Sequence, residues 1–206
     1  MPDIKVLDEV VLAWRALPQP EPFVVEGGDC GACALAGVLG VGVEVVYDRL
    51  CAGRREALSR LELESAADEA RRQGLLDRVV ADVPFWPSRK SYLAFGHPGH
   101  LSFPEWWAYV RMALDGGCYG LCSVDFDRRG ARHDIPPETD HVVVLCGARE
   151  VCVPHPTMAG ASRIDRQVLV SCSARSTPDE EWVEVRDFLS TRGGYNVLLV
   201  RPTRRP

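Results

Sequence analysis

The sequence lacks net positive charge. Its 206 residues carry a formal charge of -5 at pH 7, and the densest basic run, which includes Arg201, Arg204 and Arg205, is confined to the last residues of the chain. A protein that binds a phosphate backbone needs a basic patch on its folded surface, and this chain offers none. We therefore expect no nucleic-acid partner.

Targeting, membrane and nucleotide-binding signals are also absent from the sequence. The first eighteen residues are acidic and contain no basic start followed by an apolar run, and no later stretch reaches the length of a membrane span. The chain contains no GxGxxG pattern, no phosphate-loop signature and no internal repeat. We expect a cytoplasmic protein with no membrane contact and no cofactor.

The composition is that of an ordinary globular chain. Hydrophobic residues make up 46% and charged residues 26%, which predicts one domain over residues 1–206. The eight cysteines are even in number, but the chain is too long and too apolar to need a disulfide framework. Four of them fall in apolar, strand-like runs and are interpreted as buried thiols: Cys118, Cys122, Cys146 and Cys152.

The hydrophobic period changes along the chain from helical to strand-like. Helical spacing predicts helices over residues 4–17, 31–41, 43–52, 59–76 and 104–117. Short β-rich runs bounded by Gly, Pro, Asp or Asn predict strands over residues 118–126, 140–147, 150–154, 166–173 and 195–202, with a helical segment at 182–194. The fold class is α+β, with residues 1–80 mainly helical and residues 102–202 mainly antiparallel sheet.

The region between the two halves is rich in Pro, Gly and aromatic residues. Residues 83–104 are predicted to form a loop, and its His97 and His100 are interpreted as loop histidines. Trp86, Trp106 and Trp107 are interpreted as partly buried core side chains in preference to a cleft lining.

Two residues point to thiol chemistry. Cys30 begins the helix predicted after a Gly-Gly-Asp turn, where the positive end of the helix dipole stabilises a thiolate. His141 begins an apolar strand and follows Asp140, so its side chain is expected at the edge of the sheet. A histidine beside a cysteine can pair with the thiolate and later return a proton.

These two stretches carry a family resemblance. The run "DCGACALAGVL" at residues 29–39 resembles the nucleophile helix of papain-like cysteine peptidases, and "DHVVVLCG" resembles their histidine strand. The order of elements over residues 24–200 is most similar to that of bacteriocin-leader peptidase domains and phytochelatin synthase. The resemblance implies a papain-like fold, in which a helical half with a central nucleophile helix packs on an antiparallel sheet.

The resemblance also implies an activity and its residues. The chain would be a cysteine hydrolase or acyltransferase that acts on a peptide or small amide substrate, with Cys30 as the nucleophile and His141 as the general base and acid. Alignment with papain itself makes Cys33 the nucleophile instead; in the preferred alignment Cys33 faces the core.

The sequence departs from the family at two positions. Val24, or Gly27 in the papain alignment, stands where the family has a glutamine that helps to hold the oxyanion. The third member, normally Asp or Asn, is replaced by His155, which a turn at residues 147–150 would set directly across from His141, or by Cys172 on the following strand. Neither replacement stabilises an imidazolium as an aspartate does.

These departures leave three alternatives open. The first is an inactive papain-like module that binds a peptide or a partner protein. The second is a zinc site built from Cys30, Cys33, His141 and either Cys172 or His155, because tetrahedral zinc accepts thiolates and imidazoles. In the third, Cys30 and Cys33 are buried thiols of a closely packed helix and His141 is a hydrogen-bonded strand histidine.

Overall fold

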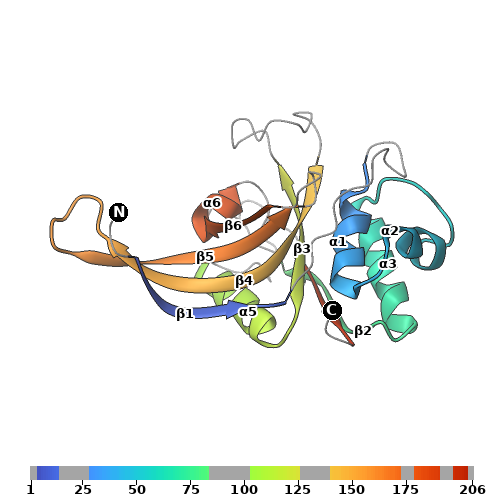
Figure 1. The fold of residues 1–206 in the computed structure, drawn as a ribbon, viewed down its shortest axis with the longest axis horizontal. Helices are drawn as coiled ribbons and strands as arrows, with labels where there is room; N and C mark the ends of the chain where they lie inside the picture. Colours follow the sequence, from blue (N-terminus) through green and yellow to red (C-terminus); the bar gives the residue numbers. More distant parts are fainter. Residues whose placement is uncertain are drawn as a thin grey trace, which may run out of the picture.

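The structure is a computed structural model of the chain, and it describes residues 4–13, 28–83, 103–125, 140–172, 179–190 and 197–203. Seven strands form one antiparallel sheet (Figure 1). Six of them follow the order β2-β7-β3-β4-β5-β6, and β1 pairs with residues 147–152 of β4, along the same edge as β3 and beyond it. The strands are β1 Lys5–Val11, β2 Leu76–Val83, β3 Tyr119–Asp125, β4 Asp140–Pro154, β5 Ser162–Cys172, β6 Asp179–Glu184 and β7 Val197–Pro202.

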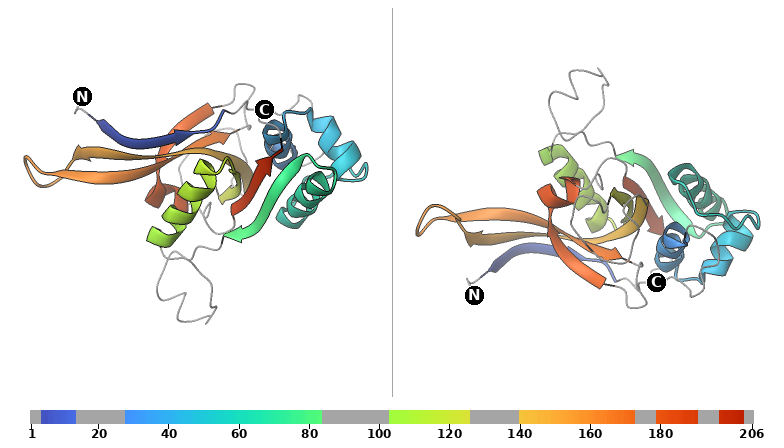
Figure 2. Two further views of the ribbon diagram at one scale, coloured as in Figure 1. Left: turned by 90° about the horizontal axis from the view of Figure 1, so that it is seen from below. Right: turned by 90° about the horizontal axis from the view of Figure 1, so that it is seen from above.

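Helices cover both faces of this sheet. They are α1 Cys30–Leu39, α2 Val43–Val45, the π-helical turn η1 Val46–Leu50, α3 Arg60–Arg72, α5 Phe103–Asp115 and α6 Val185–Ser190. Figure 1 shows α1, α2 and α3 together on one side of the sheet and α5 and α6 on the other, and Figure 2 gives the same grouping from below and above. The expected combination of helices with an antiparallel sheet is confirmed at this level.

The two faces of the sheet bury two separate apolar cores. Val142, Val144 and Leu121 pack with the helices α1, η1 and α3. Val143 and Leu145, the alternate residues of β4, pack with α5 and α6. Because successive side chains of a strand point to opposite faces, each position of β4 is assigned to one core by its register.

The small residues of α1 explain its central place. Eight of its ten residues are buried, so the helix has no solvent face and must fit among close neighbours. A Cβ added at Gly31 would lie 3.3 Å from Leu58 Cβ and 3.7 Å from Val142 Cγ2, which shows how closely the sheet and the loop after η1 approach. Gly40 ends the helix with a left-handed φ of 66°. The helix predicted over residues 31–41 is confirmed as α1.

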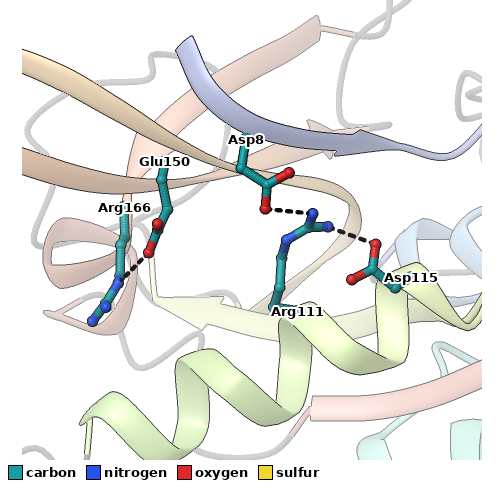
Figure 3. A network of polar contacts seen from close by, with 5 residues as sticks. All are labelled: Asp8, Arg111, Asp115, Glu150 and Arg166. Atoms are coloured by element: carbon teal, nitrogen blue, oxygen red, sulfur yellow. Dashed lines mark hydrogen bonds and ion pairs between the residues drawn. The ribbon is translucent and has the colours of Figure 1, made fainter.

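The helix predicted over residues 4–17 is wrong for its described part. Residues 5–11 form β1, which pairs with residues 147–152 of β4. The ion pair of Arg111 on α5 with Asp8 on β1, at 2.9 Å, holds the strand against the helix; the same guanidinium contacts Asp115 at 2.8 Å (Figure 3). The apolar residues of this segment do not alternate, so its strand conformation comes from pairing with the available edge of β4, which overrides the helical period.

Three further boundaries differ from the sequence prediction. Residues 147–150 form no turn, because β4 runs from Asp140 to Pro154 and pairs with β5 from Val143 to Pro154. Residues 76–83 form β2, a strand that the sequence prediction missed because it assigned residues 1–80 mainly to helices. Residues 179–184 form β6, before the short helix α6.

Among the described helices none is both long and apolar enough to cross a membrane. Only α1 joined to α2 and η1 has that composition, and that pair is bent by 101°.

Candidate functional site

Cys30 is the first residue of α1, and its side chain is partly exposed. Asp29 occupies the N-cap position, where its carbonyl accepts the Cys33 N–H at 2.8 Å as the first bond of the helix. The N–H groups of the first turn precede this bonded ladder, and the helix dipole is positive here. A thiolate at Cys30 therefore lies where the backbone stabilises negative charge.

Cys33 lies one turn further along α1 and is 1% exposed. Burial, with smaller contributions from the charges of Asp29 and Cys30, raises the pKa of the Cys33 thiol to about 12. Cys33 is therefore a protonated thiol at neutral pH, and the expectation that it faces the core is confirmed.

A buried polar contact anchors the start of α1. Tyr47 on η1 donates its hydroxyl hydrogen to Asp29 Oδ1 at 2.6 Å, and both residues are at most 1% exposed. Burial and this hydrogen bond raise the pKa of Tyr47 well above its usual range. The two residues are eighteen positions apart, and no local pattern in the sequence connects them.

His141 is the second residue of β4 and is 3% exposed. Burial lowers its pKa from 6.5 to about 4, so the imidazole is neutral at neutral pH. Its register partner is Val124 of β3, and cross-strand partners lie on the same face. His141 consequently shares the face of Val124 and Val143, which belong to the core under α5 and α6.

The register places His141 and Cys30 on different faces of β4. Helix α1 packs against the face that carries Val142 and Val144, and Gly31, next to Cys30, approaches Val142. A Cys-His dyad needs both side chains on one face or a histidine that turns around the strand end. The depressed pKa of His141 also disfavours the imidazolium that a thiolate partner requires.

His155 does not lie across from His141. It follows the far end of β4, about 45 Å from His141 at the usual rise of an extended strand. Its Nδ1 accepts hydrogen bonds from the backbone N–H groups of Thr157 and Met158, which close the turn between β4 and β5. The prediction that His155 is the third catalytic member is therefore wrong, because the turn on which it depended does not exist.

Cys172, the other candidate for the third member, lies nearer to His141. It ends β5, and its register partner on β4 is Val143, two residues from His141. Five residues considered in the sequence analysis lie outside the described residues. They are the two positions where the family has a glutamine, Val24 and Gly27, together with Trp86, His97 and His100.

Three of the four cysteines that were predicted as buried thiols are buried in the structure. Cys118, Cys122 and Cys146 are buried, and burial raises the pKa of each thiol. Cys152 is partly exposed, so the prediction is wrong for this residue. Trp106 and Trp107 are 0% and 6% exposed in the core beneath α5. Within the described ranges no three His, Cys, Asp or Glu side chains are arranged to hold a metal ion, so the proposed zinc ligands are not assembled there.

Comparison with known proteins assigns no relative to this chain. No protein-family model, curated protein or solved structure matches it.

Proposed function

We propose that Cys30 is the nucleophile of a cysteine-dependent hydrolase or acyltransferase that acts on a peptide or amide bond. One observation carries the proposal. Among the cysteines whose side chains the structure describes, Cys30 and Cys152 are partly exposed, and of these two only Cys30 begins a helix. Thiolate character and access are the two requirements for a reactive cysteine.

In this proposal the start of α1 supplies both charge stabilisation and oxyanion binding. The Cys30 thiolate attacks the carbonyl carbon, and N–H groups of the first turn of α1 donate to the developing oxyanion. The acyl group is then transferred from sulfur to water or to an amine. The family resemblance assigns the proton-carrier role to His141. The position of His141 on the sheet face opposite α1 and its lowered pKa both disfavour this role.

Alkylation with iodoacetamide tests the nucleophile without a known substrate. Cys30 is expected to react at least tenfold faster than Cys152 at pH 7, with the modified residue identified by peptide mass spectrometry. Cys152→Ala serves as the matched control, because it removes the other thiol that the structure describes as partly exposed and should leave the fast phase unchanged. Equal rates at the two cysteines would refute the proposal.

A His141→Gln variant distinguishes a Cys30-His141 dyad from a Cys30 nucleophile that works with another base. If His141 carries the proton, the variant loses turnover of a fluorogenic amide panel while Cys30 alkylation persists. If turnover is retained, Cys30 works with another base and the papain-like assignment of His141 fails.

A second candidate is a noncatalytic module that self-associates, and the long arm of the sheet favours it. We define the arm as β1 with residues 147–166 of the β4-β5 hairpin. In Figure 1 the far end of this hairpin extends away from the helices, whereas part of β1 lies beside α5. Six of the eight large apolar side chains exposed in the described structure belong to β1, its N-terminal neighbour or this hairpin: Ile4, Val6, Leu7, Val11, Met158 and Ile164.

The charges of the arm favour a second copy of this chain as the partner. They form pairs on the arm or with α5: Arg149 with Glu9, Arg166 with Glu150, Arg163 with Asp165, and Arg111 of α5 with Asp8. A surface on which both signs lie side by side offers no net attraction to a strongly charged partner, and it can complement the same surface of a second copy. Burying the remaining exposed half of each apolar side chain contributes about 1 kcal/mol, so two arms barely exceed the cost of association.

Sedimentation equilibrium distinguishes this candidate. It predicts a reversible dimer with a dissociation constant on the order of micromolar or weaker. Ile164→Lys should shift the protein to monomer. Leu61→Lys, which changes an exposed side chain of α3 away from the arm, should not. A protein that stays monomeric at every concentration would exclude self-association through the arm.

A further inference from the structure

Two cysteines lie one turn apart at the start of α1, and the proposed hydrolase uses only one of them. Cys30 is partly exposed, whereas Cys33 is 1% exposed, and both sulfurs are thiols in this structure. An oxidant from solution therefore reaches Cys30 first. The buried neighbour is left as the nearest described thiol on the same helix.

We propose that Cys30 and Cys33 form a reversible disulfide when a peroxide oxidises Cys30, and that this bond switches the nucleophile off and protects it. The inference rests on the reactivity of Cys30 proposed above. It gives Cys33 the role of the resolving thiol, in addition to its place in the core.

The geometry of the first helical turn permits the bond with a small movement. Side chains three residues apart on a helix have Cβ atoms about 5–6 Å apart, and a disulfide needs about 3.5–4.5 Å. Cys30 is the first helical residue, and its own N–H precedes the ladder that begins with the Cys33 N–H to Asp29 carbonyl bond. Cys30 can therefore approach Cys33 without breaking that bond.

The chemistry balances in two steps. The Cys30 thiolate attacks one oxygen of the peroxide, and the O–O bond breaks. Cys30 becomes a sulfenic acid, and the other oxygen leaves as hydroxide, which takes a proton from solvent to form water. The sulfur of Cys33 then attacks the sulfenic sulfur, and the hydroxyl group leaves with the proton of Cys33 as water. Two thiols are oxidised in total and one peroxide is reduced.

The environment of Cys33 determines how fast the second step runs. Burial and the nearby Asp29 keep Cys33 protonated at neutral pH, so resolution requires loss of that proton during attack. We therefore expect the disulfide to form more slowly than the sulfenic acid and to form faster as the pH rises.

Hydrogen peroxide followed by dithiothreitol tests the proposal on the full-length protein. One equivalent of peroxide should abolish iodoacetamide labelling of Cys30, dithiothreitol should restore at least four fifths of it, and the oxidised peptide that contains both cysteines should have lost two hydrogen atoms. A second equivalent of peroxide, added to both proteins before dithiothreitol, should leave the recovery of the wild type unchanged. In Cys33→Ala the labelling should then be lost without recovery, because the second equivalent oxidises the sulfenic acid to sulfinic acid. Cys152→Ala should behave as the wild type.

The outcomes separate this inference from the proposed function. Slow labelling of Cys30 before any oxidation refutes the nucleophile itself. Fast labelling that peroxide abolishes irreversibly in the wild type, or equally reversibly in Cys33→Ala, refutes the switch and leaves the nucleophile standing. A disulfide that links Cys33 to Cys51 in the peptide map also refutes it. The initial labelling rate of Cys33→Ala, expected within twofold of the wild type, verifies that this variant is folded.

Discussion

Acidification should destabilise the protein through His141, and the size of the effect follows from its burial. The imidazole is 3% exposed, and burial lowers its pKa from 6.5 to about 4. In the unfolded chain the same side chain takes up a proton near pH 6.5. Titration of His141 therefore leaves the free energy of unfolding unchanged above pH 6.5. The free energy of unfolding decreases as the pH falls from 6.5 toward 4, because the unfolded state binds the proton first.

The two pKa values set the magnitude. Between pH 8 and pH 5 the linkage relation predicts a loss of about 2 kcal/mol, which approaches about 3 kcal/mol near pH 4. A loss of about 2 kcal/mol corresponds to a decrease in the melting temperature of roughly 4–8 °C for a chain of this size. Most carboxylates titrate below this window, so the window isolates histidine.

Urea unfolding followed by circular dichroism at half-unit steps from pH 8 to pH 5 measures the effect. His141→Gln cannot titrate, and its free energy of unfolding should change by about 2 kcal/mol less over this range than that of the wild type. His155→Gln, at the partly exposed turn of the arm, is measured in parallel as a second histidine variant. Equal slopes for the wild type and His141→Gln would refute the assignment of a buried neutral histidine.

Three further predictions concern the environment of the site and the arm. Tyr47→Phe removes the hydrogen bond to the buried Asp29 and should lower the free energy of unfolding by about 1.5–3 kcal/mol, whereas Tyr109→Phe on α5 should change it by under about 0.5 kcal/mol in the same urea titration. Gly147→Ala places a Cβ 2.9 Å from the Val10 carbonyl oxygen and should cost about 1–3 kcal/mol; Gly42→Ala, with no atom within 4 Å, should be nearly neutral by thermal unfolding. Elemental analysis should find far less than one zinc per chain, and a stoichiometric value lost in Cys30→Ala would restore the zinc site.

Local patterns in the sequence were enough to locate most helices and strands. The small-residue run became α1, and Ser59 with Glu62 forms the capping box that begins α3. Short β-rich runs bounded by turn residues became β3, β5 and β7. These features depend on capping, glycine placement and hydrophobic period, which are properties of neighbouring residues.

The candidate nucleophile could also be identified from the sequence, because a cysteine at a helix start is a local feature. The partners of that cysteine were not. Tyr47 approaches Asp29 only because η1 packs beside α1, and the burial that lowers the pKa of His141 comes from strands and helices far away in the chain.

Tertiary pairing decided the remaining questions. The edge of β4 beyond β3 recruits residues 5–11 as a strand, although their apolar spacing also fits a helix. Pairing with β1 on one edge and with β5 on the other keeps β4 extended through Gly147. His155 therefore lies at the far end of the arm. The register of β4 then assigns His141 to one face and the neighbours of Cys30 to the other. A shift of one residue would exchange these faces, and only long-range hydrogen bonding and packing select between them.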